Sequence, residues 1–254
     1  MMLEYLKKEV WRANLDLVRY GLIILTFGNA SGIDRKKGLV AIKPSGVSYD
    51  ELKPSDIVLV GLDGKVAEGT LNPSSDTPTH LALYRMFPGV GGIVHAHSEY
   101  ATMFAQAAKE IPCLGTTHAD HFQGPVPVTR FLTKREVKAD YEGNTGRVIL
   151  ERFADLDPLG TPAVLVAGHG PFAWGRTPSE AAQNALAGLQ HASSFIRREL
   201  AQSLQMRIMP ELRFMLDDSW ERGARIDALL NHLPPPAPCK DPEETAADQG
   251  TEED

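Results

Sequence analysis

An amphipathic pattern marks the start of the chain. Apolar side chains recur there every three or four residues, which places them on one face of a helix. The pattern predicts a helix over residues 3–20, ending at Gly21, because glycine readily adopts the left-handed conformation of a helix C-cap. Its apolar face consists of Leu3, Leu6, Val10, Ala13 and Leu17.

After residue 21, short apolar runs alternate with turn sequences, a pattern typical of strands. Four runs occupy residues 22–26, 39–43, 56–69 and 91–97, and the third is predicted to form a hairpin that turns at Asp63-Gly64. The segment AVLVAGHGPFAWG, residues 163–175, predicts a strand, a tight turn and a second strand.

Helices are predicted between these strands. One begins at Ser75 or Asp76, either of which can cap it, with Pro78 in its first turn. Others cover residues 98–108, residues 148–153 after a polar stretch at 133–147, and residues 177–200 with Thr177 as N-cap. This mixture predicts an α/β or α+β domain built on a single sheet, which we assign to residues 1–232.

The C-terminal segment differs in composition from the rest. Residues 233–254 are acidic, rich in proline and poor in apolar side chains, so a disordered tail is expected. Most of the net charge of −7 lies in residues 240–254, which hold seven acids and one lysine. The remaining chain is close to neutral, so its charge gives no support for nucleic-acid binding.

Membrane and disulfide signals are both weak. No apolar run reaches the roughly 20 residues that span a bilayer, and the N-terminus lacks the apolar core of a signal peptide. A cytoplasmic protein without a membrane partner is therefore expected. Two cysteines make no disulfide framework: Cys113 is expected to be buried in an apolar stretch, and Cys239 to be a free thiol in the tail.

Three histidines carry the strongest chemical signal. His95 and His97 are two positions apart in a predicted strand, so both side chains face the same side. His169 lies between two glycines after an apolar strand, where a sharp turn and a close backbone approach are allowed. Each could instead be an ordinary polar or turn histidine. Together, three imidazoles would hold a divalent ion and leave a position open for substrate.

Polar turns add an anion signal. Ser74 and Ser75 precede a predicted helix, whose free N–H groups favour a phosphate. IKPSGV and TFGNASG contribute two further turns, although helix capping or ordinary turn chemistry would also explain such residues. In GTTHADHF, Asp120 is flanked by His118 and His121 and could act as a general acid or base near a metal, or be a plain surface carboxylate.

Taken in order, these segments resemble the class II aldolase family, and among its members they are most similar to the L-ribulose-5-phosphate 4-epimerases. The resemblance runs from about residue 3 to about residue 200. It rests on TFGNASG, IKPSGV, PSSDTPTHLALYRMFPGVGGIVHAHS, IPCLGTTHADHF and VLVAGHGPFAWG.

The resemblance implies a layered α/β/α domain around a largely antiparallel sheet, and a homotetramer with active sites between subunits. It implies Zn²⁺, or another divalent ion such as Mn²⁺ or Co²⁺, on His95, His97 and His169, with Asp76 counted in the metal site. Asp120 takes an acid/base role. Substrate and phosphate contacts fall on Gly28, Asn29, Ser45, Gly46, Ser74 and Ser75.

The implied reaction is epimerisation at C4 of a pentulose 5-phosphate by retro-aldol cleavage and re-addition across C3–C4. That reaction needs two acid/base groups, and the family's epimerases carry a tyrosine near the C-terminus for one of them. Here no tyrosine follows Tyr141. His121, His232 or a different C-terminal partner in the tetramer could substitute.

Two alternatives to the epimerase remain. The missing tyrosine favours an aldolase or lyase that cleaves a sugar phosphate to dihydroxyacetone phosphate and an aldehyde. An adducin-like binding protein without catalysis is the third possibility, but such proteins are expected to have lost the metal ligands.

Overall fold

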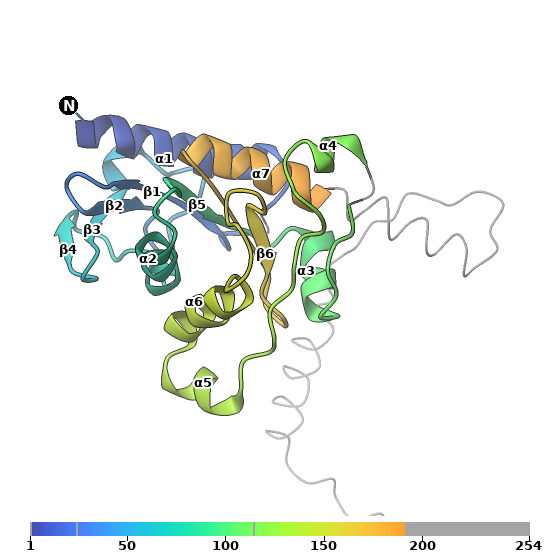
Figure 1. The fold of residues 1–254 in the computed structure, drawn as a ribbon. Coiled ribbons are helices and arrows are strands. Elements are labelled where there is room, and N and C mark those ends of the chain that lie inside the picture. The colour runs from blue at the N-terminus through green and yellow to red at the C-terminus, as the bar shows by residue number, and fades with distance from the viewer. Residues whose placement is uncertain (1, 24, 114, 191–254) are drawn as a thin grey trace, which may run out of the picture. The chain divides into compact units, whose positions relative to one another are not determined.

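The computed structural model describes residues 2–23, 25–113 and 115–190. Its strands form one seven-stranded sheet in the order β4-β3-β2-β1-β5-β7-β6, and each neighbouring pair is antiparallel (Figure 1). The strands are β1 (Asn29–Asp34), β2 (Leu39–Ile42), β3 (Val58–Gly61), β4 (Val66–Glu68), β5 (Gly92–His95), β6 (Ala163–Leu165) and β7 (Pro171–Gly175).

Helices cover both faces of this sheet, which confirms the layered α/β/α architecture (Figure 1). On one face lie α1 (Met2–Arg19), α3 (Glu99–Gln106) and α7 (Pro178–Gln190). On the other lie α2 (Thr77–Met86) and α6 (Tyr141–Arg152). Three short helices complete the described part: η1 (Pro54–Asp56), α4 (Thr116–Ala119) and α5 (Lys134–Ala139).

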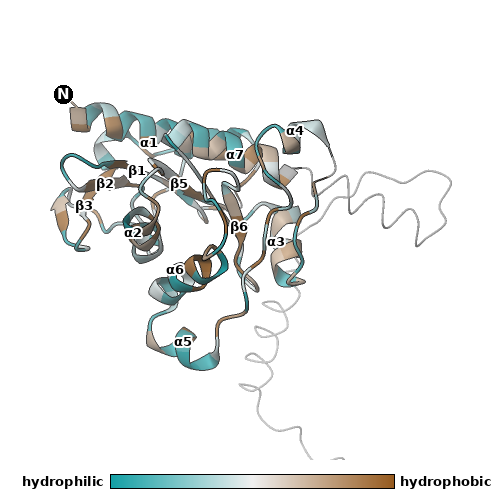
Figure 2. Cartoon of the chain, viewed as in Figure 1, coloured by the Kyte–Doolittle hydropathy of each residue, from teal (hydrophilic) through white to brown (hydrophobic). Residues whose placement is uncertain are grey.

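Each face of the sheet has its own apolar core. Alternate residues of a strand point to opposite faces, so β7 sends Ala173 toward α7 and sends Phe172 and Trp174 toward α2 and α6. Brown, hydrophobic colour accordingly follows the central strands and the inner helix faces (Figure 2). The site described below therefore sits on a sheet that is fixed from both sides.

Most predicted elements are confirmed, including the hairpin at Asp63-Gly64 and the strand–turn–strand at residues 163–175. Thr177 also caps α7, because its Oγ1 accepts a hydrogen bond from the Glu180 N–H at 3.1 Å. The predicted strand over residues 22–26 is wrong, because the described residues in this range form no strand. Leu25 has a φ of 54° and is 72% exposed, which no sheet position would allow.

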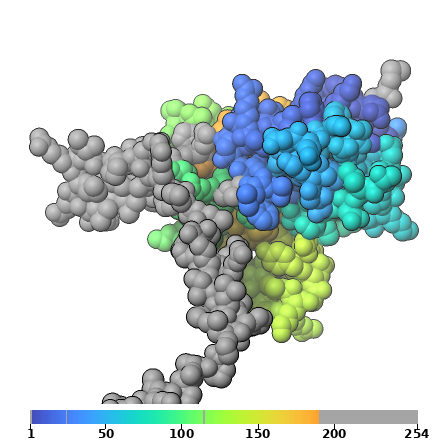
Figure 3. All heavy atoms as spheres, turned by 180° about the vertical axis from the view of Figure 1, so that it is seen from behind, coloured from blue at the N-terminus to red at the C-terminus, as the bar shows by residue number. Residues whose placement is uncertain are grey.

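The polar stretch at residues 133–147 is a second correction, because most of it is helical. Thr133 caps α5 in a capping box with Glu136, and Asp140 caps α6. α5 has no buried residue and is largely teal in Figure 2, so hydrophobic periodicity could not reveal it. Seen from behind, the yellow-green α5–α6 segment forms a compact surface below the cyan atoms of the N-terminal half (Figure 3).

The prediction that Cys113 is buried is also wrong, because its side chain is exposed. Within the described ranges, no helix is both long and apolar enough to cross a membrane. The predicted end of the domain at residue 232, the tail at 233–254, Cys239 and His232 lie outside the described residues.

Candidate active site

His95 ends β5 and is almost fully buried. Its ring stacks on Phe172 of β7, with centroids 4.2 Å apart and an interplanar angle of 20°. Its Nδ1–H donates to the Pro171 carbonyl at 2.9 Å. Burial and, to a smaller extent, the neighbouring His97 lower the pKa of His95 to about 3, against the opposing effect of the Pro171 hydrogen bond. The ring is therefore neutral, with its Nε2 lone pair free for a ligand.

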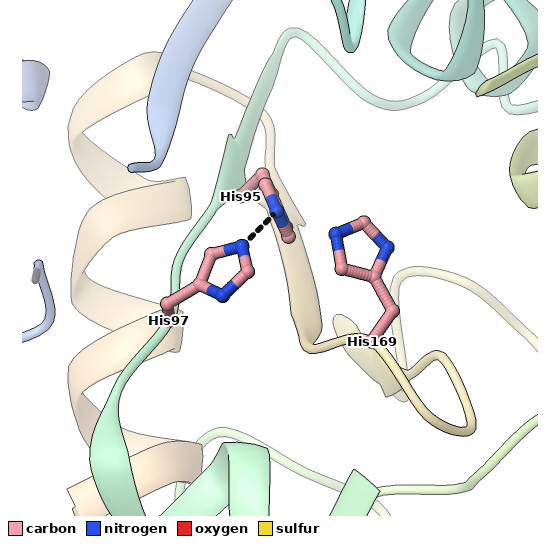
Figure 4. A group of neighbouring side chains, drawn as sticks. All are labelled: His95, His97 and His169. Atoms are coloured by element: carbon pink, nitrogen blue, oxygen red, sulfur yellow. Dashed lines mark hydrogen bonds between the residues drawn. The ribbon is translucent and has the colours of Figure 1, made fainter. Parts of the chain in front are cut away.

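His97 lies two residues further on, just beyond the end of β5, so the predicted strand over 91–97 is shorter than expected. Its Nε2 is 2.9 Å from the Nε2 of His95 (Figure 4). Burial lowers the pKa of His97, and the negative charge of Asp76 opposes this shift. The two nitrogens are thus within hydrogen-bond distance of each other, and a divalent ion bound to both, at about 2.0–2.1 Å from each, would take the place of that hydrogen bond.

His169 reaches the same point from the β6–β7 turn (Figure 4). Its ring centroid lies 4.7 Å from that of His95 and 5.3 Å from that of His97. The predicted roles of the flanking glycines are confirmed: Gly168 has a φ of +76°, and a Cβ on Gly170 would lie 3.1 Å from the Ala96 carbonyl. Only glycine allows this turn to press against the end of β5.

The three histidines fit a divalent metal ion. One nitrogen from each lies within 4.8 Å of the others. The Nδ1 of His169 is buried without a hydrogen-bond partner among the described residues, which is costly unless a ligand satisfies the ring. Burial lowers the pKa of His169 to about 3, so it too is neutral. Three neutral imidazoles suit Zn²⁺ and leave one coordination position open.

Asp76 lines the same cavity beside this cluster. It is the N-cap residue of α2, yet its side chain makes no capping hydrogen bond. Its Oδ2 instead accepts from Asn29 Nδ2–H at 2.7 Å, and the same amide donates to Ser74 Oγ at 3.0 Å. The carboxylate is therefore held toward β1 and the cavity, and its place in the metal site stays a prediction.

The start of α2 and the turn after β2 also line the cavity. Ser75 is exposed there next to Ser45 and Gly46, and Gly46 has a φ of +73° that suits its turn. Behind them, Lys43 donates from Nζ to the Val47 carbonyl at 2.8 Å. The hydroxyls and the lysine favour an anion such as phosphate, whereas the N–H groups of Asp76 and Thr77 are already bonded to Ser74.

Gly28 also lines the cavity, directly before the first residue of β1. It has a φ of +110°, and a Cβ there would lie 2.9 Å from the His95 carbonyl oxygen. Its own carbonyl accepts a hydrogen bond from the Tyr49 hydroxyl at 2.7 Å. Any side chain at this position would push the start of β1 away from His95.

These residues surround one cavity of about 420 Å³. All the predicted site residues except Asp120 line it: Gly28, Asn29, Ser45, Gly46, Ser74, Ser75, Asp76, His95, His97 and His169. Asp120 is exposed at the C-terminal end of α4 and does not line the cavity. A single copy of the described chain therefore does not bring Asp120 to the histidines, and its acid/base role stays a prediction.

Sequence reasoning missed several lining residues: Thr26, Phe27, Lys43, Pro44, Tyr141 and Glu142. Four of them lie inside or directly beside the TFGNASG and IKPSGV motifs, so the motifs themselves contained the signal. Tyr141 and Glu142 begin α6, within the polar stretch that gave no helical pattern.

Comparison with known proteins agrees with this geometry. Residues 8–192 match the family model described as the class II aldolase and adducin N-terminal domain. A second model, ribosome-binding factor A, matches residues 172–230, but its described portion is β7 and α7 of the aldolase-type sheet and helix layer. The longer match accounts for every element around the cavity.

Among curated proteins, the chain is 55% identical over 184 residues to "L-ribulose-5-phosphate 4-epimerase UlaF" of Salmonella paratyphi B, covering 72% of this chain and 81% of that one. Among solved structures, it resembles an L-fuculose 1-phosphate aldolase with a TM-score of 0.62 and 27% identity, covering 88% of this chain and 96% of that one. It also resembles YgbL of Escherichia coli, described as a putative aldolase/epimerase/decarboxylase, with a TM-score of 0.62 and 25% identity, covering 84% of this chain and 96% of that one. The chain thus belongs to the class II aldolase family.

Proposed function

We propose that this chain is a metal-dependent L-ribulose-5-phosphate 4-epimerase that forms D-xylulose 5-phosphate by cleaving and remaking the C3–C4 bond. The single observation that carries the proposal is the cavity, which is lined both by three converging neutral histidines and by the serines of the turns at Ser45 and Ser75. The 55% identity to the Salmonella epimerase supports the choice of substrate. Zn²⁺ is the proposed ion, with Mn²⁺ or Co²⁺ as substitutes.

Each of these two groups of residues would have its own task. A divalent ion held by the histidines would supply Lewis-acid stabilisation of the negative charge that cleavage leaves on the C1–C3 part. Ser45, Ser75 and the start of α2 would hold the phosphate, which in a pentulose 5-phosphate stays on the aldehyde part. Retention of that aldehyde lets it rotate and be attacked on its other face before it escapes.

Assembly would complete the site. Asp120 is exposed and lies outside the cavity of its own chain, so we propose that it serves as acid/base in the site of a neighbouring copy within a homotetramer. The proposed location of the enzyme is the cytoplasm.

A second candidate is an aldolase that releases its products. The structural likeness to an L-fuculose 1-phosphate aldolase favours it, as does the absence of a tyrosine after Tyr141. A binding protein without catalysis is disfavoured, because the three histidines still converge within 4.8 Å.

Product analysis separates these candidates. The purified full chain is incubated with Zn²⁺ and either L-ribulose 5-phosphate or L-fuculose 1-phosphate, and products are identified by NMR. D-xylulose 5-phosphate from the first substrate is the expected result. Free glycolaldehyde phosphate with dihydroxyacetone, or dihydroxyacetone phosphate from the second substrate, would favour the aldolase. No conversion of either sugar, with or without metal, would contradict both.

A further inference from the structure

Tyr141 lines the cavity, although it lies outside the TFGNASG and IKPSGV motifs. It is the first residue of α6, and Asp140 caps that helix by accepting from the Gly143 N–H at 3.0 Å. The Tyr141 carbonyl accepts from Thr145 Oγ1–H at 2.9 Å, and the next carbonyl, of Glu142, accepts from Thr79 Oγ1–H of α2 at 2.6 Å. The position of its backbone is thus fixed against the same helix that carries Asp76.

The ring of Tyr141 lines the cavity beside His169. Its centroid is 5.5 Å from that of His169, at an interplanar angle of 45°. The charge of Asp76, which also acts on His97 and His169, is close enough to affect its phenol. The phenol therefore lies close to the three histidines.

The hydroxyl of Tyr141 has no hydrogen-bond partner among the described residues. A tyrosine hydroxyl can donate one hydrogen bond. By contrast, the amide of Asn29 is already occupied by Asp76 and Ser74. Tyr141 is thus a fixed donor that faces the cavity with its hydrogen bond unmade.

The proposed reaction needs a donor close to the proposed ion. When the C3–C4 bond breaks, the oxygen on C4 changes from hydroxyl to aldehyde carbonyl, and it changes back on re-addition. C4 lies between the ion-bound C1–C3 part and the phosphate on C5. A donor to this oxygen polarises the carbonyl for attack and fixes its orientation.

We propose that Tyr141 contacts the substrate directly and donates a hydrogen bond from its hydroxyl to the oxygen on C4. This inference rests on the proposed function, and it assigns to Tyr141 the recognition of the carbon whose configuration changes. No proton transfer by Tyr141 is required, since the acid/base steps remain with other groups.

The test is Tyr141→Phe, which removes one oxygen and keeps the ring against His169. We expect kcat/KM for L-ribulose 5-phosphate to fall about 10- to 100-fold, as the loss of one donor to a developing charge predicts. Zinc content and the unfolding midpoint should stay at wild-type values. Tyr5→Phe, which removes the same atom from an exposed tyrosine on α1, should leave kcat/KM unchanged.

A substrate analogue separates recognition of C4 from a structural role. The 4-deoxy analogue of L-ribulose 5-phosphate lacks the oxygen in question, so it should inhibit wild type and Tyr141→Phe with the same constant, while L-ribulose 5-phosphate binds the variant more weakly. Equal kcat/KM in wild type and Tyr141→Phe would overturn the inference alone, as would loss of zinc from the variant. A wild-type enzyme that converts no L-ribulose 5-phosphate would overturn the proposed function and this inference together.

Discussion

Phe172 connects the folding of the sheet to the metal site. It is fully buried, lies opposite His95 in the β5–β7 pairing, and stacks on the His95 ring at 4.2 Å. The rings of His80 and His169 meet the Phe172 ring edge-on, with centroid distances of 6.0 Å and 6.1 Å. The ring therefore packs against His95 and holds its imidazole beside His97 and His169, where the proposed ion would bind.

Phe172→Leu removes this ring while keeping most of the volume. A volume-conserving core change and the loss of aromatic contacts together cost about 1 to 2 kcal/mol of unfolding free energy. Because supporting contacts of a ligand typically change metal affinity 10-fold or more, zinc binding should weaken about tenfold. Urea unfolding of the metal-free protein measures the first quantity, and isothermal titration with Zn²⁺ measures the second.

Phe153→Leu is the matched control. Phe153 is 5% exposed in the same core, where its ring packs on Phe87 and Trp174 and on no histidine ring among the described residues. It should lose similar stability and keep wild-type zinc affinity. Equal zinc affinities in the two variants would refute the claim that Phe172 orients His95.

Two further predictions concern buried polar groups. Burial lowers the pKa of His80 to about 3, against about 6.5 unfolded, so below pH 6.5 the unfolded chain takes up a proton that the folded chain refuses. For this residue, the unfolding free energy of chelator-treated protein should therefore fall by about 1.4 kcal/mol per pH unit as the pH is lowered from 6 to 4. Urea titrations at several pH values should show a shallower pH dependence of the unfolding free energy in His80→Gln than in wild type. The same pH dependence in both proteins would contradict this prediction. Asn29→Ala removes the amide that donates hydrogen bonds to Asp76 and Ser74. The variant should lose about 1 to 3 kcal/mol of unfolding free energy, and its turnover should fall more than tenfold. Unchanged unfolding free energy and kcat would show that this amide is dispensable.

Local chemistry explains what the sequence could predict. The turn residues Gly28, Gly46 and Gly168 have positive φ angles in the structure, so their positions carry information without any tertiary contact. The spacing of His95 and His97 also predicts that both face one side, although His97 lies just beyond the end of β5. These features locate the histidines and the polar turns, and in the structure they line one cavity.

Tertiary contacts explain what the sequence could not predict. Tyr141 enters the cavity because α6 packs on α2 through Thr79, and a polar helix start gives no periodic signal of that packing. The support of His95 by Phe172 depends on the β5–β7 register, which is set only when the sheet forms. Asp120 depends on a second copy under the proposed function, so no pattern within one chain could bring it to the site.

The most direct test of the account is metal stoichiometry measured together with turnover. Wild type and His97→Ala are purified, stripped with chelator, reloaded with Zn²⁺ and analysed by mass spectrometry of metal content, and the same samples are assayed with L-ribulose 5-phosphate. His97→Ala removes one of three converging ligands. One zinc per chain and turnover in wild type, with both lost in the variant, is the predicted result. A variant that keeps one zinc per chain and full turnover would contradict the assignment of the site.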